Sequence, residues 1–104
     1  MPDTFNTTNR ELIIGLAARY GVPAIYFNRY FAASRGPIAY GADYVELFRQ
    51  AAGYVDQILH GANPGELPIQ LPAKFDLVIN VRTANALGIK VPQTLLSFAN
   101  ELIE

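Results

Sequence analysis

The chain has 104 residues, of which 51% are hydrophobic and only 16% are charged, and its net charge is −1. This length allows one domain at most, and the apolar balance predicts a folded chain rather than a disordered one. The near-zero net charge, without any basic run, argues against a nucleic-acid partner. Because there is no cysteine, disulfides and thiolate chemistry are excluded, and no apolar run is long enough to span a membrane.

The first predicted helix covers residues 8–20. Thr8 and Glu11 fit a capping box, in which both side chains satisfy free N–H groups of the first helical turn. Gly21 supplies a C-terminal stop. The apolar segment 23–27 is short and bounded by glycine and proline, which is typical of a buried parallel strand.

Two weaker elements precede the longest helix. Residues 28–34 can form a short helix or an irregular turn, and residues 37–41 form a second brief strand. A long helix is then predicted from Asp43 to His60, with Asp43 as its cap and Glu46 three residues later. Its apolar side chains form one continuous stripe: Phe48, Ala51, Ala52, Val55, Ile58 and Leu59.

The last part of the chain carries the strongest strand signal. Residues 67–72 contain two prolines, which predicts an extended crossing segment rather than a central strand. Phe75–Val81 is an apolar strand that leads into a short helix over 83–87 and a last helix over 93–103, with no further strand expected. The alternation of helices and short apolar strands along the chain predicts an α/β fold with a parallel sheet. Since sheets usually have about five strands and we count three, the fold is expected to be partial.

The chain resembles the C-terminal part of ABC-transporter substrate-binding proteins, which have the type I periplasmic-binding-protein fold. The resemblance rests on three blocks: RELIIGLAARYGVPAIY, then YGAD, then LFRQAAGYVDQILHGANPGELPIQLPAKFDLVINVRTANALGIKVPQTLL. It covers residues 2–104. The chain departs from the family pattern at Ser34-Arg35-Gly36-Pro37, where a pair of glycines is usual, and over 97–101, where an Ala-Arg-Ala-Asp-like run is usual.

The resemblance implies a C-terminal fragment of a two-lobed protein, with a partial three-layer parallel-sheet fold. Residues 1–104 would form a single incomplete domain. Residues 8–35 and 75–104 would belong to the second lobe, 42–61 to a helix of the first lobe, and 36–41 and 67–74 to the segments that cross between the lobes. The missing N-terminal lobe, or a second copy of the chain, would cover the surfaces left bare.

The same resemblance implies a function in solute uptake. The ligand of such a protein lies between the lobes, and characterised relatives resemble carriers of aromatic amino acids or similar small organic solutes. An ABC permease would be the membrane partner, and no cofactor is implied. The full-length parent would be periplasmic, whereas the chain as written shows no signal peptide and would stay in the cytoplasm.

Candidate ligand-binding residues follow from the predicted strands, because sites in α/β binders lie at the carboxyl ends of parallel strands. Tyr26, Phe27 and Asn28 leave one strand, and Asn80, Arg82 and Thr83 leave another. Tyr40 and Asp43 lie at the first crossing, where tyrosine can stack on an aromatic solute and aspartate can bind an amine. The predicted ligand-binding residues are therefore Tyr26, Asn28, Tyr40, Asp43 and Asn80.

Each of these residues also has a structural interpretation. Tyr26 and Phe27 can be packing aromatics, Asn80 and Asp43 can be helix N-caps, and Arg82 can be a solvated residue at a helix start.

We expect neither a catalytic nor a metal site. His60 is the only histidine, and with Asp56 four residues earlier it lacks a third ligand. Because no Ser-His-Asp set can be assembled either, an enzyme is not expected. The alternative to a binding protein is a self-associating α/β module with no ligand function of its own.

Overall fold

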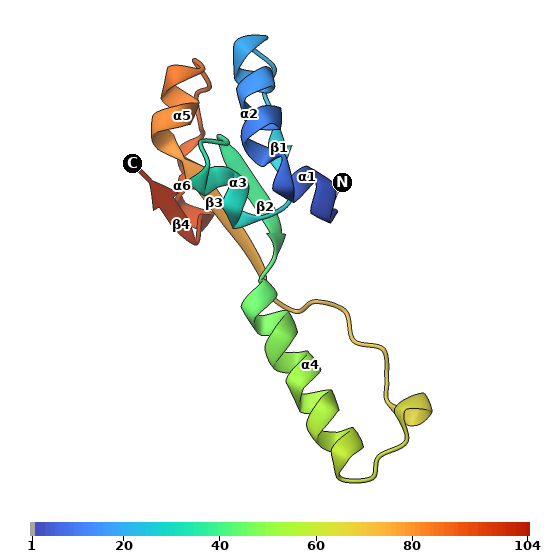
Figure 1. Ribbon diagram of the computed structural model, residues 1–104. Coiled ribbons are helices and arrows are strands. Elements are labelled where there is room, and N and C mark those ends of the chain that lie inside the picture. The colour runs from blue at the N-terminus through green and yellow to red at the C-terminus, as the bar shows by residue number, and fades with distance from the viewer. Residues whose placement is uncertain (1) are drawn as a thin grey trace. The chain divides into compact units, whose positions relative to one another are not determined.

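The computed structural model describes residues 2–104 and divides the chain into two compact units (Figure 1). The first unit joins the N-terminal residues, up to Gly41, to Asp76–Glu104. The second unit comprises Ala42–Phe75.

The first unit begins with two helices, α1 (Thr4–Thr8) and α2 (Arg10–Arg19). Asp3 caps α1, because its carboxylate accepts a hydrogen bond from the Asn6 N–H at 2.6 Å. The predicted capping box at Thr8 is wrong, since Thr8 is the last residue of α1 and α2 starts after Asn9 without a side-chain cap. The carboxylate of Asp3 starts the helical region one turn earlier than the sequence pattern indicated.

The sheet has four strands in the order β1-β2-β3-β4. Their bounds are Ile25–Tyr26 for β1, Ile38–Ala42 for β2, Phe75–Asn80 for β3 and Glu101–Ile103 for β4. β1 pairs with β2 in parallel, with Tyr26 opposite Ala39. β3 pairs with β4 in parallel, with Asn80 opposite Ile103. The predicted α/β class with parallel strand pairing is therefore confirmed for these two pairs.

The middle pair of strands, β2 and β3, runs in opposite directions. The Asn80 N–H at the end of β3 donates to the Pro37 carbonyl oxygen just before β2, at 2.8 Å. The Asp43 N–H just after β2 donates to the Lys74 carbonyl oxygen just before β3, at 3.0 Å. The carboxyl ends of β1 and β2 consequently lie at one edge of the sheet, and those of β3 and β4 lie at the opposite edge.

The fourth strand was not predicted, and the expected helix over 93–103 is wrong beyond Phe98. The helix α6 covers Gln93–Phe98, and Ala99 then adopts extended angles. Asn100 docks on β3: its N–H donates to the Leu77 carbonyl oxygen, and its side-chain oxygen accepts from the Leu77 N–H, both at 2.8 Å. Pairing with the open edge of β3 thus overrides the helical spacing of the last apolar residues.

Two short helices connect the strands of the first unit. α3 (Arg29–Ala33) lies between β1 and β2, and α5 (Val81–Ala86) follows β3 directly. α3 resolves the choice left open for residues 28–34 in favour of a helix.

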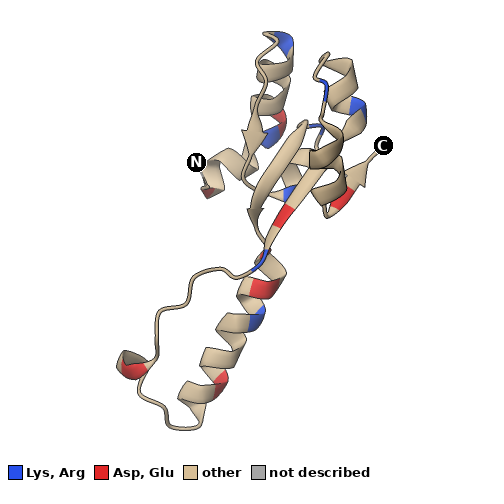
Figure 2. Cartoon of the chain, turned by 180° about the vertical axis from the view of Figure 1, so that it is seen from behind, with Lys and Arg blue, Asp and Glu red and all other residues tan. Residues whose placement is uncertain are grey.

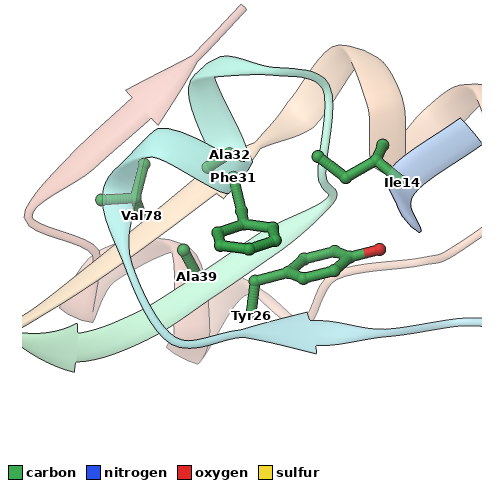
Figure 3. Close-up of a cluster of buried hydrophobic side chains, with 6 residues drawn as sticks. All are labelled: Ile14, Tyr26, Phe31, Ala32, Ala39 and Val78. Atoms are coloured by element: carbon green, nitrogen blue, oxygen red, sulfur yellow. The ribbon is translucent and has the colours of Figure 1, made fainter. Parts of the chain in front are cut away.

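The core of the first unit gathers around Phe31, which is fully buried on α3 (Figure 3). The rings of Tyr26 and Phe31 stack with centroids 4.8 Å apart, and the Phe27 ring lies tilted against Phe31 at 4.9 Å. The buried cluster consists of Ile14, Tyr26, Phe31, Ala32, Ala39 and Val78. This packing holds β1 and α3 firmly together.

The second unit consists of α4 (Tyr44–Leu59), the short 3₁₀ helix η1 (Pro64–Glu66) and a following segment without regular structure. Asp43 caps α4 by accepting from the Val45 and Glu46 N–H groups at 2.9 and 3.2 Å, as the sequence predicted. The Tyr54 hydroxyl of α4 donates to the Pro68 carbonyl oxygen and so holds the extended segment against the helix. Within the second unit, no residue of α4 is buried.

Candidate functional site

Two hollows lined by described residues of the first unit open at different places on its surface. The smaller one, here called the aromatic hollow, has a volume of about 390 Å³. It is lined by Asn6, Ile13, Ile25, Tyr26, Phe27, Phe31 and Tyr40. The larger one, here called the interhelix hollow, has a volume of about 940 Å³ and lies among α2, the end of α3, α5 and the end of β4. Both volumes suit a small organic ligand, for which pockets of roughly 300 to 1,000 Å³ are usual.

The aromatic hollow forms where β1 and β2 approach each other closely. A Cβ atom on Gly41 would lie 1.8 Å from the Phe27 carbonyl oxygen, so only glycine fits at this position. The close approach brings Tyr40, just before Gly41, to the same hollow as Tyr26 and Phe27. Three of the aromatic candidates from the sequence therefore share one site at the carboxyl end of β1.

Tyr26 is both a core residue and a wall of the aromatic hollow. It is buried, and its ring stacks on Phe31. Burial raises the pKa of its hydroxyl, because the phenolate is poorly solvated there. Tyr26 can thus offer a neutral hydroxyl to a ligand while its ring supports the core.

Asn28 does not line the aromatic hollow. Its side chain is buried, and its oxygen accepts a hydrogen bond from the Tyr30 N–H at 3.0 Å, which caps α3. The position of Asn28 at the end of a strand was predicted from the sequence, but its side-chain oxygen caps the helix α3 that follows.

Asn80 ends β3, which runs in the direction opposite to β1 and β2, and its side chain does not line the aromatic hollow. Its side-chain oxygen accepts from the Thr83 N–H, and its Nδ2 donates to the Ala32 carbonyl oxygen, both at 3.0 Å. It lines the interhelix hollow together with Arg82 and Thr83. The structure therefore brings the two groups of strand-exit residues to two separate places.

Asp43 belongs to the second unit, where its carboxylate has several partners. Besides capping α4, it forms an ion pair with the Lys74 Nζ at 3.0 Å. The hydrogen bond from Lys74 holds the pKa of Asp43 below its usual value, and the N–H groups of Glu46 and Val45 act in the same direction. The alternative interpretation of Asp43 as a cap is confirmed.

An ion pair between Arg29 and Glu101 was missed by the sequence reasoning. The guanidinium binds both carboxylate oxygens, with Nε–Oε2 at 2.6 Å and Nη2–Oε1 at 2.8 Å, and so ties the start of α3 to β4. The pair raises the pKa of Arg29 and lowers the pKa of Glu101. The partners lie 72 residues apart in sequence, so no local pattern could have indicated them.

The described part of the chain shows no group of three His, Asp or Glu side chains that could hold a metal ion. His60 Nδ1 lies 3.3 Å from Asp56 Oδ1, but these are two groups only. Among residues 2–104, no helix is both long and apolar enough to cross a bilayer.

Residues 1–103 match the family described as ABC transporter substrate binding protein. Among solved structures, a conserved domain protein from Vibrio cholerae is 31% identical to this chain, with a TM-score of 0.90 over 96% of this chain and 34% of that one. No curated protein matches the chain.

Two more distant structures show the same fold. An ABC domain from Streptococcus pneumonia, solved in complex with L-Trp, is 22% identical, with a TM-score of 0.86 over 97% of this chain and 35% of that one. CD0873, a substrate binding protein with adhesive properties from Clostridium difficile, is 19% identical, with a TM-score of 0.56 over 88% of this chain and 31% of that one.

These likenesses confirm the predicted fold class, a part of a periplasmic-binding-protein-like α/β fold. The chain spans about a third of the length of each of these proteins. The match over residues 1–103 shows that the chain belongs to the ABC transporter substrate binding protein family.

Proposed function

We propose that the chain forms part of the solute-binding component of an ABC importer, and that the aromatic hollow is one wall of the site for a small aromatic solute. The observation that carries this proposal is the convergence of Tyr26, Phe27 and Tyr40 on one hollow at the carboxyl end of β1. That edge is where ligands of α/β binding proteins are usually held. β2 leads from this edge into the second unit.

In this proposal the two units belong to different lobes of the importer component. The first unit would be part of the second lobe, and α4 would be part of the first lobe. Residues 36–41 and 67–74 would cross between them. The division of the chain after Gly41 and after Phe75 supports this arrangement. The remaining wall of the cleft would come from residues equivalent to the two thirds of the related structures that this chain does not match.

The chemistry of the aromatic hollow favours a flat, apolar ligand with a polar group. The rings of Phe27 and Tyr40 can stack on an aromatic solute, and such contacts are worth about 0.5–1.5 kcal/mol each beyond the area that they bury. The Tyr26 hydroxyl, with its raised pKa, can donate a hydrogen bond to a carboxylate. An aromatic amino acid such as L-Trp combines both features, and the Streptococcus relative was solved with L-Trp.

The same geometry assigns supporting roles to the other candidate residues. Asn28 and Asn80 would shape the helix starts that follow β1 and β3, and Asp43 would fix the start of α4. The bound solute would be handed to a membrane permease in the periplasm, without chemical change. This proposal therefore calls for no catalytic group and no cofactor.

A titration of the 104-residue chain with L-Trp, followed by amide resonances in NMR, tests the proposal. One wall of a cleft should bind only in the millimolar range, equivalent to about −4 kcal/mol. We expect shifts at Tyr26, Phe27 and Tyr40 and none at Asn80. Shifts confined to the interhelix hollow, or no shifts at millimolar L-Trp, would contradict the proposal.

A pair of matched variants sharpens this test. Tyr40 and Tyr30 are equally exposed in the first unit, at 55% and 56%, but only Tyr40 lines the aromatic hollow. Tyr40→Ala should raise the dissociation constant for L-Trp about tenfold, because about one stacking contact is lost. Tyr30→Ala should leave this dissociation constant unchanged. Equal effects of both substitutions would show that the aromatic hollow is not the site.

A further inference from the structure

The two ends of the second unit are joined to each other through Asp43 and Lys74. The Asp43 N–H donates to the Lys74 carbonyl oxygen at 3.0 Å, and the Lys74 Nζ lies 3.0 Å from Asp43 Oδ2. The other carboxylate oxygen of Asp43 accepts from the Val45 and Glu46 N–H groups of α4. Acidic and basic residues both lie at the start of α4 (Figure 2). Asp43 and Lys74, here called the clasp, tie the chain segment that enters the second unit to the segment that leaves it.

The clasp is a firm attachment because the Asp43 carboxylate is ionised and largely enclosed. Its side chain is only 15% exposed, so few water molecules compete with Lys74 for it. The hydrogen bond from Lys74, together with the N–H groups of Glu46 and Val45, holds the pKa of Asp43 below its usual value. A backbone hydrogen bond and an ion pair therefore act at the same point, and α4 is fixed to both segments there.

The first unit holds the same two segments a few residues away from the clasp. Gly41 approaches the backbone of Phe27 so closely that an added Cβ would lie 1.8 Å from the Phe27 carbonyl oxygen. On the returning segment, the N–H and the carbonyl oxygen of Leu77 are both bonded to Asn100, at 2.8 Å. These four residues all belong to the first unit.

Few residues remain between the attachments of the two units. Ala42 alone lies between the closely packed glycine and the clasp on the outgoing segment. Phe75 and Asp76 alone lie between the clasp and Leu77 on the returning segment. The chain divides into its two units at the same places, after Gly41 and after Phe75. A rotation of one unit against the other must therefore be absorbed by φ and ψ changes at these three residues.

We propose that Ala42, Phe75 and Asp76 form a hinge between the two units, and that the clasp confines the bending to them. The clasp does so by making both segments turn with α4 as one body. In the proposed solute-binding component, this hinge would control access to the aromatic hollow, and that link rests on the proposed function. The hinge itself stands on the two segments alone and is measured without any solute.

Residual dipolar couplings of the full chain, measured by NMR in the absence of solute, test the hinge. They report how each amide is oriented within the rigid body that carries it. We expect the Lys74 amide to share one alignment with the amides of α4, and the amides of Val78 and Ile79 in β3 to need a different alignment. A single alignment that fits α4 and β3 together would overturn the hinge. A Lys74 amide that follows β3 instead of α4 would overturn the clasp.

Two substitutions that break the ion pair test the part played by the clasp. Lys74→Met removes the ammonium and keeps the apolar stem, whereas Asp43→Asn removes the charge and keeps a residue that caps helices well. Each should lower the hydrogen-exchange protection factor of the amide at position 43 about two- to fivefold, in line with the strength of a partly exposed ion pair. The double variant should show the same loss as either single variant, because all three lack the same interaction. Additive losses would overturn the clasp.

Lys90 supplies the matched control. It is the only other lysine of the chain and lies in the first unit. Lys90→Met should leave the protection factor at position 43 unchanged, and it should leave the amide at position 74 aligned with α4. In Lys74→Met the amide at position 74 should no longer share that alignment. Equal effects of the two lysine substitutions would overturn the proposal.

Discussion

Replacing Gly41 with alanine tests the close approach of β1 and β2 that forms the aromatic hollow. The new Cβ would lie 1.8 Å from the Phe27 carbonyl oxygen and 2.9 Å from its carbonyl carbon. These neighbours are backbone atoms, so no side chain can rotate away, and the strands must separate by more than 1 Å at this point. We expect the free energy of unfolding to fall by about 3 kcal/mol, as for other severe core clashes.

Chemical denaturation followed by circular dichroism measures this loss. Gly15→Ala is the matched control, because Gly15 lies inside α2 and an added Cβ there meets nothing within 4 Å. The same methyl group should stabilise this helix by about 0.5–1 kcal/mol. If Gly41→Ala were as stable as the unmodified chain, the proposed packing of β1 against β2 would be refuted.

Three further substitutions have defined outcomes in the same denaturation assay. Arg35 has a φ of +79°, so Arg35→Gly should stabilise the chain by about 1 kcal/mol, and a loss of stability would show that this strain is absent. Asn80→Ala removes a helix cap and the bond to the Ala32 carbonyl oxygen, and should cost about 2–3 kcal/mol; a cost under 1 kcal/mol would contradict both bonds. The ion pair with Arg29 lowers the pKa of Glu101 in the folded chain below 4.5. The pair therefore adds at most about 1 kcal/mol to the free energy of unfolding above pH 4.5, and this stabilisation is lost as the pH falls through the lowered pKa of Glu101. Glu101→Gln should abolish that acid-side loss, and an unchanged pH profile would exclude the ion pair as its source.

Much of the fold could be predicted because its signals are local. The cap at Asp43 and the apolar stripe after it are contained in one continuous segment, and α4 forms where they indicated. The strand at Phe75 is a run of apolar residues followed by a capping asparagine, and β3 with α5 matches it within two residues. Local patterns of this kind are decided by the chain's own backbone and neighbouring side chains.

The features that were missed depend on partners far away in the sequence. β4 exists because Asn100 finds the open edge of β3, whereas the spacing of Leu102 and Ile103 alone favours a helix. The direction of β3 relative to β2 is likewise a property of the assembled sheet. Since strand direction decides which carboxyl ends meet, the sequence grouped Asn80 with Tyr26, although β1 and β3 end in opposite directions and the two residues line different hollows.

The candidate site was partly predictable for the same reason. Tyr26 and Tyr40 were chosen as residues at a strand exit and at a crossing, and the close approach at Gly41 brings them to one hollow. Phe31 and Asn6 complete this hollow from helices whose packing no local pattern reveals. The left-handed φ of Arg35, at +79°, is a conformation suited to glycine, and no local sequence pattern indicated it.

Nuclear Overhauser contacts between L-Trp and the chain test the central claim most directly, because they report which side chains the indole ring touches. We predict contacts from the indole protons to the ring protons of Phe27 and Tyr40 at millimolar L-Trp. Contacts to Thr83 or Leu87 of the interhelix hollow, without any to Phe27 or Tyr40, would contradict the claim that the aromatic hollow is the wall of the solute site.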